Sequence, residues 1–292
     1  MANYRTCALL GRFDDARVAE PAALLVPALR ARGLAVLVQA SAAGAPPGVE
    51  ALDDSSLAAR AELGIVIGGD GSLLYAARLL GAAGVPLLGI NRGRLGFLTD
   101  VMPADMLQVL DAALEDRCEQ DHRALLQAEV RGADGSRRGQ LALNDVVLSK
   151  WETGRILDFE TFINGRFVNS HGGDGLVVAS ATGSTAYALS CGGPIVEPGL
   201  DVLVVVPICP HTLSDRPVVV SRSSRIMIRL QPRPGTRAQI TCDGVVMGEL
   251  VPGDELHILP SPARLTLLHP PGYDYFRLLR GKLSWGRAGN GQ

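Results

Sequence analysis

A short polar segment, Gly68-Gly69-Asp70-Gly71-Ser72, lies between an apolar run and a stretch with helical spacing. Glycines let a backbone approach phosphate oxygens closely, and the first turn of a helix offers unpaired N–H groups, so this loop suits a nucleotide. A carboxylate beside phosphates is repulsive unless it orients a metal ion or removes a proton from an attacking hydroxyl. Asp70 is therefore a candidate catalytic base. The alternative is a tight turn in which Asp70 favours the helix dipole.

A polar pair, Asn144-Asp145, interrupts an apolar strand pattern that runs from residue 141 to residue 148. Consecutive strand residues point to opposite faces, so at least one of the two side chains faces the core or a cleft. An unpaired buried carboxylate is costly, and a ligand with hydroxyl groups would satisfy both side chains. The alternative is a bulge or a strand end at the surface.

A third segment repeats the order of apolar strand, small-residue loop and helix. Asp174-Gly175 precedes it, and Gly192-Gly193-Pro194 ends it. The loop carries four hydroxyl side chains that could bind sugar hydroxyls or phosphate oxygens without adding charge: Ser180, Thr182, Ser184 and Thr185. An ordinary helix N-cap explains one or two of these hydroxyls but not four. A serine nucleophile is not expected, because no G-x-S-x-G elbow is present.

Other polar positions have simpler explanations. His211 is interpreted as a loop histidine and Asp243-Gly244 as a hairpin turn, and no spacing of His, Cys and carboxylates indicates a metal cage. Arg92 follows a strand end and could face phosphates, although exposed loop arginines are commoner. The loop at residues 68–72 is neither a Walker loop nor a complete G-x-G-x-x-G motif.

The elements that position these residues follow from hydrophobic periodicity. Strands are predicted at residues 6–10, 34–38, 63–67 and 85–90, and helices at residues 16–32, 72–80 and 104–115. This alternation is typical of an α/β domain with a parallel sheet. Turn signals then separate closely spaced apolar runs, which predicts a β-rich second half with helices near residues 184–190 and 273–282. Asn164-Gly165 predicts a hairpin with a type I′ turn.

Length and composition exclude several classes of protein. The 292 residues suffice for about two domains, and a formal net charge of -2 with 4% aromatic residues argues against a nucleic-acid partner. The five scattered cysteines lack a C-x-x-C pair, which indicates reduced thiols. The apolar run Val202–Val206 is far shorter than the roughly 20 residues that span a bilayer, and no signal peptide opens the chain. We expect a cytoplasmic protein without a membrane partner.

Taken in order, these motifs resemble those of the bacterial NAD kinase family. The matching segments are Gly68–Gly71 (GGDG), Asn91–Thr99 (NRGRLGFLT), Asn144-Asp145, Asp174-Gly175, Thr182–Tyr187 (TGSTAY), Gly192–Pro194, Pro210–Leu213 with Arg216-Pro217, and Cys242–Gly244. GGDG alone also occurs in lipid and sugar kinases, but the ordered set is specific. The resemblance extends from the first strand to about Trp285.

The resemblance implies transfer of the γ-phosphoryl group of ATP, with a divalent cation such as Mg²⁺, to the 2′-hydroxyl of the adenosine ribose of NAD, which gives NADP. It implies that Asp70 is the general base. Family positions that hold NAD match Asp70, Gly71, Asn144, Asp145, Arg155, Gly172, Asp174, Thr182, Thr185, Ala186, Tyr187, Ala188, Leu189 and Ser190. Weaker matches to phosphate or ATP positions are Gly68, Gly69, Asn91 and Arg92.

The family's architecture is also implied. It consists of a Rossmann-like α/β domain at residues 1–117 with 272–292, and a β-sandwich-like domain at residues 118–271 that binds NAD. The terminal helix returns to the first domain, and the subunits form a homodimer or homotetramer.

Three departures from the family pattern bear on substrate binding. Asp145 stands in place of a glutamate, which shortens the reach by one methylene. Gly172 occupies a position where some NAD-specific members carry arginine, so the choice between NAD and NADH is open. Val245 replaces a glutamine, which removes a polar contact.

Other functions remain as alternatives. An NADP-dependent oxidoreductase would need a G-x-G-x-x-G loop that the sequence lacks, and a lipid or sugar kinase would not need the TGSTAY segment. A dinucleotide-sensing module would bind its ligand without consuming ATP, and its binding would not depend on Asp70.

Overall fold

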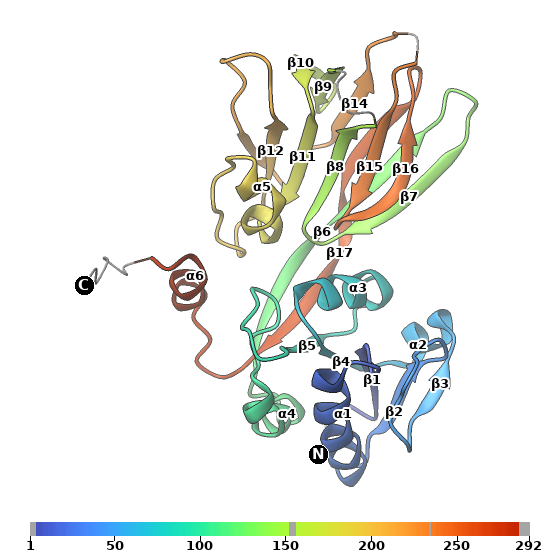
Figure 1. Ribbon diagram of the computed structural model, residues 1–292, viewed down its shortest axis with the longest axis vertical. Helices are drawn as coiled ribbons and strands as arrows, with labels where there is room; N and C mark the ends of the chain where they lie inside the picture. Colours follow the sequence, from blue (N-terminus) through green and yellow to red (C-terminus); the bar gives the residue numbers. More distant parts are fainter. Residues whose placement is uncertain (1–3, 152–155, 234, 286–292) are drawn as a thin grey trace. The chain divides into compact units, whose positions relative to one another are not determined.

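The computed structural model describes residues 4–151, 156–233 and 235–285 (Figure 1). The chain forms two compact units, one of residues 1–122 with 265–292 and the other of residues 123–264. The boundaries expected from the sequence were at residues 117/118 and 271/272. The C-terminal helix belongs to the first unit, as the resemblance implied.

The first unit is built on a parallel sheet. The sheet order is β17-β5-β4-β1-β2-β3. The strands are β1 (Thr6–Gly11), β2 (Ala35–Gln39), β3 (Glu50–Leu52), β4 (Leu63–Ile67), β5 (Leu87–Ile90) and the end of β17 (Glu255–His269). The helices are α1 (Ala16–Ala31), α2 (Asp54–Arg60), α3 (Asp70–Leu80), α4 (Met106–Leu114) and α6 (Tyr275–Leu283). The predicted Rossmann-like class is confirmed.

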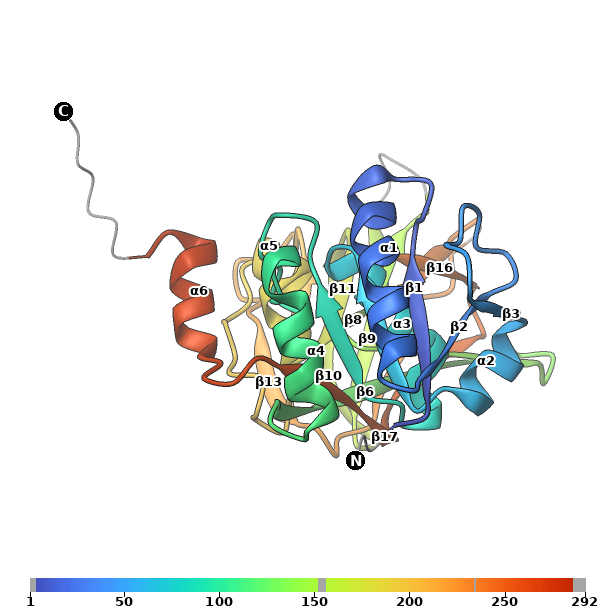
Figure 2. The same ribbon diagram turned by 90° about the horizontal axis from the view of Figure 1, so that it is seen from below.

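Side-chain alternation along the strands explains why helices cover both faces of this sheet. Leu63, Ile65 and Ile67 of β4 pack with residues of α1 and α4 in one buried cluster. Gly64 faces the other side, where a Cβ would lie 3.1 Å from Leu80 of α3. Figures 1 and 2 both show α1 and α4 next to each other. A strand with two covered faces is apolar throughout, which is the pattern seen in the sequence.

Several element boundaries differ from the predictions. The strand β3 and the helix α2 were missed, because β3 has only three residues and α2 has a single buried residue, Leu57. Helix α3 begins at Asp70 rather than at Ser72, so Asp70 lies in its first turn. Helix α4 begins at Met106, after a short 3-10 turn at Pro103–Asp105.

The second unit is made mainly of antiparallel strands. A six-stranded sheet has the order β13-β12-β11-β8-β15-β16. Its strands are β8 (Asp145–Lys150), β11 (Gly175–Ser180), β12 (Val202–Ile208), β13 (Val218–Ser221), β15 (Ala238–Cys242) and β16 (Val245–Leu250). The other strands are β6 (Glu119–Arg131), β7 (Arg137–Ala142), β9 (Leu157–Ile163), β10 (Arg166–Gly173), β14 (Ile226–Leu230) and the start of β17. A 3-10 turn (Thr182–Thr185) and α5 (Tyr187–Ser190) follow β11.

Two sheets of the second unit share a buried core. Leu148 of β8 and Val178 of β11 pack in one cluster with Phe159 of β9 and Ile228 of β14. The opposite face of the six-stranded sheet carries Val177, which packs in another cluster with residues of the 181–196 segment. The β-sandwich-like class expected for this half of the chain is confirmed.

The turns predicted at the two hairpins are confirmed. Asn164 and Gly165 have φ of 53° and 76°, and Asp243 and Gly244 have φ of 49° and 75°. Positive φ at both central residues is what a type I′ turn requires. The apolar pattern at residues 141–148 does not form one strand, because β7 ends at Ala142 and β8 begins at Asp145. The alternative of a strand end is therefore correct, but Asp145 is buried and not at the surface.

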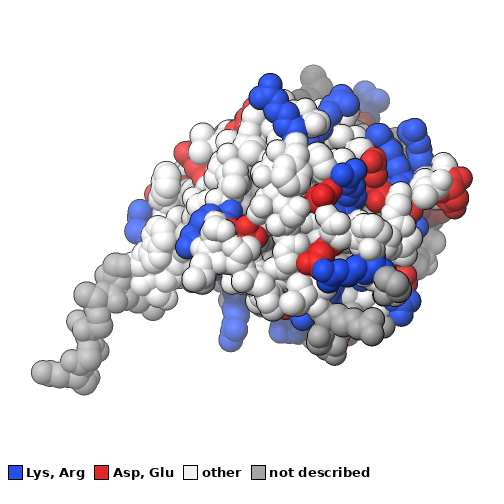
Figure 3. Space-filling model, turned by 90° about the horizontal axis from the view of Figure 1, so that it is seen from above, with Lys and Arg blue, Asp and Glu red and all other residues white. Residues whose placement is uncertain are grey.

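The surface charges and the state of the cysteines agree with what the composition predicts. On the face shown in Figure 3, basic and acidic side chains lie next to one another. All five cysteines are free thiols. Among the described residues, no helix is long and apolar enough to cross a membrane.

Candidate active site

The carboxylate of Asp70 is held by a turn that lies about 27 residues further along the chain. Oδ2 accepts the backbone N–H of Phe97 at 2.8 Å. Oδ1 accepts the backbone N–H groups of Leu98 at 3.0 Å and Thr99 at 3.2 Å, and also the Thr99 hydroxyl at 3.2 Å. Each carboxylate oxygen has two lone pairs, so Oδ2 keeps acceptor capacity that Oδ1 has used. The turn therefore fixes the carboxylate and leaves Oδ2 with an unused lone pair.

Two glycines allow this turn to approach Asp70. A Cβ at Gly89 would lie 2.7 Å from the Leu98 carbonyl oxygen and 2.9 Å from Thr99 Cα. A Cβ at Gly96 would overlap Asp70 Oδ1 and the Thr99 hydroxyl. Neither glycine has a positive φ, so close approach is the reason that a side chain is excluded here. The segment Asn91–Thr99, which resembles a family motif, thus contains the turn that orients Asp70.

A cavity of about 470 Å³ lies beside the first turn of α3, at the carboxyl ends of β1 and β2. Its lining includes Gly11, Arg12, Gln39, Gly71, Ser72 and Tyr75. Ligands of open α/β sheets bind at this end of the strands, and a volume of this size suits a nucleotide. Of these residues, Gly71 was predicted from the sequence. Arg12, Gln39 and Tyr75 were not, because single residues of these types carry no distinguishing sequence pattern.

Asn91 and Arg92 make contacts within the protein in the loop after β5. Asn91 is fully buried, and its side-chain oxygen accepts the backbone N–H of Gly93 at 2.7 Å. Arg92 donates to Asp15 at 2.9 Å, and Asp15 also caps α1. Hydrogen bonds from Arg17, with a smaller contribution from Arg92, hold the pKa of Asp15 well below its usual range. Both residues therefore shape the loop after β5, and their contact with phosphate stays a prediction.

In the second unit, the chain around Asn144 is held by Asp243. The carboxylate of Asp243 accepts the backbone N–H groups of Leu143 at 2.9 Å, Asn144 at 2.7 Å and Asp145 at 3.2 Å. A hairpin turn accounts for Asp243-Gly244 only in part, because Asp243 also fixes the bend between β7 and β8. Asn144 Oδ1 is buried and has no hydrogen-bond partner within the described part of the chain.

Asp145 is a buried carboxyl group at the start of β8, with 5% of its surface exposed. Burial raises its pKa to about 7, and the charge of Asp243 adds to the shift. A group with this pKa can either accept or donate a hydrogen bond near neutral pH. A buried acceptor without a partner next to a carboxyl of raised pKa is typical of a binding site, because a ligand with hydroxyl groups would satisfy both.

The raised pKa of Asp145 makes the free energy of unfolding depend on pH. The folded state binds this proton more tightly than the unfolded state, whose carboxyl group titrates near 3.8. This stabilisation is complete below about pH 4 and is lost as the pH rises through 7, by up to about 4 kcal/mol. Asp145→Asn is therefore expected to exceed the wild-type protein in stability by about 2–4 kcal/mol at pH 8 and to match it near pH 4. Urea unfolding at both pH values measures this difference.

Asp134→Asn is the control for this prediction. Hydrogen bonds from Ser136 lower the pKa of Asp134, which is the opposite direction. This variant should show no gain of stability at pH 8. An Asp145→Asn protein that is less stable than the wild type at pH 8 would contradict the prediction.

The four hydroxyls in the Ser180–Thr185 segment all take part in hydrogen bonds inside the protein, and two of them belong to fully buried side chains. Ser180 is fully buried and donates to the Leu143 carbonyl at 2.6 Å. Ser184 is fully buried and donates to the Ala181 carbonyl at 2.7 Å. Gly183 packs so closely on the Asn144 backbone that a Cβ would overlap it. The hydroxyl of Ser180 thus joins this loop to the Asn144 bend, and the hydroxyl of Ser184 joins it to Val196, so both donors are used inside the protein.

The other residues of this segment differ in exposure. Thr182 is buried and accepts a hydrogen bond from Arg123 at 3.3 Å, and Thr185 is partly exposed. Tyr187 has 44% of its surface exposed, whereas Ala188 is fully buried in the core. Ala186 and Leu189 are partly exposed, and Ser190 is exposed. The side chain of Ala188 therefore lies in the core, whereas the side chains of its neighbours reach the surface.

Asp174 and Gly172 lie at the end of β10, next to the loop after β12. Asp174 pairs with Lys150 at 2.6 Å, a partner that sequence analysis missed. A Cβ at Gly172 would lie 3.3 Å from Asp158 Oδ1, so a side chain there would contact a carboxylate. The neighbouring His171 pairs with buried Asp215 at 3.0 Å. Arg155 lies outside the described residues.

Metal-ligating side chains are dispersed in the described part of the chain. Over residues 4–151, 156–233 and 235–285, no group of three or more His, Cys, Asp or Glu side chains could hold a metal ion. Val245, which departs from the family pattern, has 42% of its surface exposed at the start of β16.

Two family models match this chain. The model of the ATP-NAD kinase N-terminal domain matches residues 50–118, and that of the ATP-NAD kinase C-terminal domain matches residues 143–269. Among curated relatives, the NAD kinase of Nitrosococcus oceani is 43% identical over 286 residues, which are 97% of this chain and 98% of the relative. The NAD kinase of Ectopseudomonas mendocina is 44% identical over 290 residues, which are 98% of each chain.

Two solved structures are similar in fold. One is an NAD kinase from Archaeoglobus fulgidus in complex with ATP, with a TM-score of 0.75 and 26% identity over 96% of this chain and 98% of that one. The other is yeast NADH kinase complexed with NADH, with a TM-score of 0.92 and 23% identity over 99% of this chain and 90% of that one.

Proposed function

Because the chain belongs to the NAD kinase family, we infer that it transfers the γ-phosphoryl group of ATP to the 2′-hydroxyl of the adenosine ribose of NAD⁺, which gives NADP⁺. We propose that Asp70 accepts the proton of that hydroxyl. The observation that carries this proposal is the carboxylate of Asp70, which three backbone N–H groups orient while Oδ2 keeps a lone pair.

The proposed reaction requires little of the protein beyond position and charge. The 2′-oxygen forms a bond to the γ-phosphorus as the bond from that phosphorus to the bridging oxygen of ADP breaks. The hydroxyl proton passes to Asp70 Oδ2 and later to solvent. A positioned base contributes about 10²–10⁴ to such a rate, and alignment of the reactants contributes much of the rest.

We propose that the cavity beside α3 takes the phosphate side of the reaction. Gly71 lines it, Gly68 and Gly69 lead into the helix just before, and the first turn of α3 offers unpaired N–H groups to phosphate oxygens. Arg12 supplies positive charge at the rim. ATP is the donor, in agreement with the ATP complex of the Archaeoglobus relative.

The residues of this site fit a divalent cation only if the triphosphate also coordinates it. The described residues offer no cage of three ligands, and Asp70 is the carboxylate that directly follows Gly68 and Gly69 at the start of α3. Magnesium is commonly held by one or two carboxylates together with substrate phosphates and water. When bound in this way, it would neutralise charge on the phosphate oxygens.

We propose that NAD is held by the bend and loop of the second unit. Asn144 offers a buried acceptor without a partner, and Asp145 offers a carboxyl group that can donate or accept. Asp174, Thr182, Thr185 and Tyr187 lie on the loops next to them or at the end of β10. Arg155, Gly172, Ala186, Leu189 and Ser190 complete the proposed set, and Ala188 supports it from the core.

Gly172 leaves room that an arginine would fill, and we propose that it permits both NAD⁺ and NADH as acceptors. Arginine at this position would meet Asp158, because a Cβ already lies 3.3 Å from that carboxylate. A cytoplasmic location and a homodimer or homotetramer also stay predictions, as does the absence of nucleic-acid and membrane partners.

The activity is tested by mixing purified protein with ATP, magnesium and either NAD⁺ or NADH, and by omitting each in turn. A coupled dehydrogenase detects NADP⁺ or NADPH. Product from NAD⁺ that depends on ATP is the expected result, and product from NADH at a similar rate would support the proposal for Gly172. Folded protein that binds NAD⁺ and yields no product from either acceptor would contradict the proposed function.

A further inference from the structure

A buried histidine at the end of β17 joins two acidic side chains. His269 has 1% of its side chain exposed, and its Nδ1 lies 2.8 Å from Asp100 Oδ2. Its Nε2 lies 3.7 Å from Asp121 Oδ2. The ring stacks on Tyr273, with centroids 3.8 Å apart and planes at 7°. These contacts fix the orientation of the imidazole ring, with Nδ1 directed to Asp100.

Asp100 stands between two residues that are anchored in different ways. Thr99 donates its backbone N–H and its hydroxyl to Asp70. Val101 donates its backbone N–H to the Gly89 carbonyl of β5 at 3.1 Å. Displacement of Asp100 would therefore be transmitted to Thr99, because the β5 anchor prevents the chain from moving as a whole.

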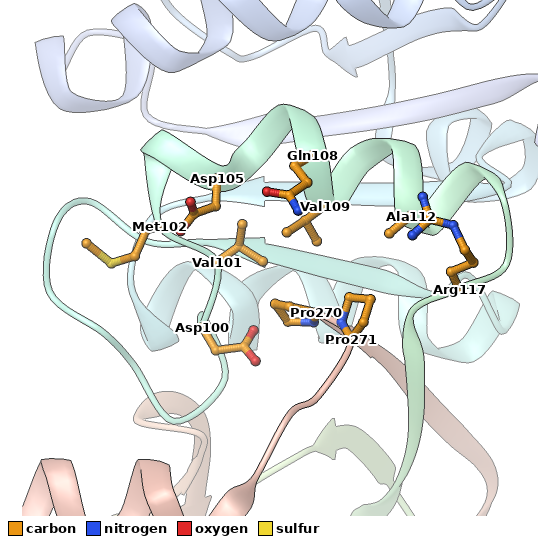
Figure 4. Close-up of a pocket in the computed structure, with 10 residues that line it drawn as sticks. All are labelled: Asp100, Val101, Met102, Asp105, Gln108, Val109, Ala112, Arg117, Pro270 and Pro271. Atoms are coloured by element: carbon orange, nitrogen blue, oxygen red, sulfur yellow. The ribbon is translucent and has the colours of Figure 1, made fainter.

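Asp100 depends on His269 for its position. Its Oδ1 is buried, with no hydrogen-bond partner among the residues described, so the bond from Oδ2 to His269 is the one that holds the carboxylate. Figure 4 shows Asp100 facing Pro270 and Pro271, which follow His269, in the lining of a cavity of about 310 Å³. Without the imidazole the carboxylate would be buried and unpaired, and it would turn toward this cavity and solvent.

We propose that His269 is a positioning residue for phosphoryl transfer: through Asp100 it fixes the turn at residues 96–99, whose N–H groups hold Asp70. The proposal rests on the role proposed above for Asp70. His269 lies on a strand far from the glycine loop in sequence, and it neither binds a substrate nor exchanges a proton with one.

The test compares two amides at position 269 with alanine. In His269→Asn the amide N–H can take the place of Nδ1–H, whereas in His269→Gln it reaches toward the Nε2 position and Asp121. His269→Ala should lower kcat about tenfold and leave the KM for NAD⁺ within about twofold, because misplaced reacting groups affect the chemical step. The His269→Asn variant should keep most of the wild-type kcat, and the His269→Gln variant should not.

His257→Ala is the matched control. His257 is on the same strand and also pairs with a carboxylate, Glu255 at 2.7 Å, but it lies in the other unit, opposite Met227 of β14. It should keep kcat within about twofold. If alanine at position 269 prevents folding, the comparison of the Asn variant with the Gln variant still tests the positioning role, since both variants place an amide at the same buried site.

Two results separate the failure of this proposal from the failure of the proposed function. Equal kcat for the Asn and Gln variants, or a KM effect as large as the kcat effect, would overturn the positioning role while Asp70→Asn remains inactive. Full turnover in Asp70→Asn would instead remove Asp70 as the base, and the positioning proposal would be lost with it.

Discussion

Asp70→Asn is expected to lower kcat by about 10²–10⁴-fold with NAD⁺ and ATP, because the amide cannot accept the hydroxyl proton. Asparagine has the same shape and keeps one oxygen, so the KM for NAD⁺ should change little. Its NH₂ group would face one of the N–H donors of the 97–99 turn, which predicts a loss of stability of about 1–3 kcal/mol. Steady-state kinetics and urea unfolding of the same preparation measure the two effects.

Asp53→Asn controls for the structural part of this effect. Asp53 is also a carboxylate that accepts backbone N–H at the start of a helix, since it caps α2 through Ser56 at 2.9 Å. This variant should lose some stability and keep kcat. If Asp70→Asn kept kcat within a few-fold of the wild type, Asp70 would be a turn residue and the base would have to lie elsewhere.

Gly96→Ala is expected to lower kcat by about 10²-fold, although it introduces only a methyl group. The new Cβ would overlap Asp70 Oδ1 and the Thr99 hydroxyl, so the carboxylate must move. Misplacement of a reacting group by about 1 Å can cost a rate factor of this size. Overpacking at this buried site should also cost about 1–3 kcal/mol of stability.

A double-mutant cycle shows whether the effect of Gly96→Ala passes through Asp70. In the Asp70→Asn background, Gly96→Ala should have little further effect on kcat. Gly281→Ala is the control, because a Cβ at Gly281 of α6 meets nothing within 4 Å. It should leave kinetics unchanged and raise stability slightly, since alanine favours helix. Multiplicative losses in the double variant would show that Gly96 acts independently of Asp70.

Much of the fold could be predicted because the relevant signals are local. The strand at residues 63–67 was predicted with its observed bounds, since five consecutive buried residues lie between turn signals. The type I′ turn at Asn164-Gly165 follows from two residues that tolerate positive φ. The helix α2 and the strand β3 were missed because short, exposed elements carry almost no apolar periodicity.

The candidate site was predictable as a set of segments but not as a geometry. Sequence analysis selected Asp70, Asn144 and Asp145 because a carboxylate or an amide in an apolar or glycine-rich context is unusual. It interpreted Asp243 as a turn residue and took Ser180 and Ser184 as available donors. The structure shows Asp243 holding the 143–145 bend and both serines used internally.

The sequence by itself determined the order of strand, glycine loop and helix around Asp70, the β-rich second half and the family to which the chain belongs. All of these depend on residue types and on spacings of a few positions. Only the tertiary structure decided that the 97–99 turn holds Asp70, that Asp243 holds Asn144 and that His269 holds Asp100. These partners are 28, 99 and 169 positions apart. The physical reason is that such pairs meet only after the sheets have formed, and no local pattern records which distant backbone N–H a carboxylate will face.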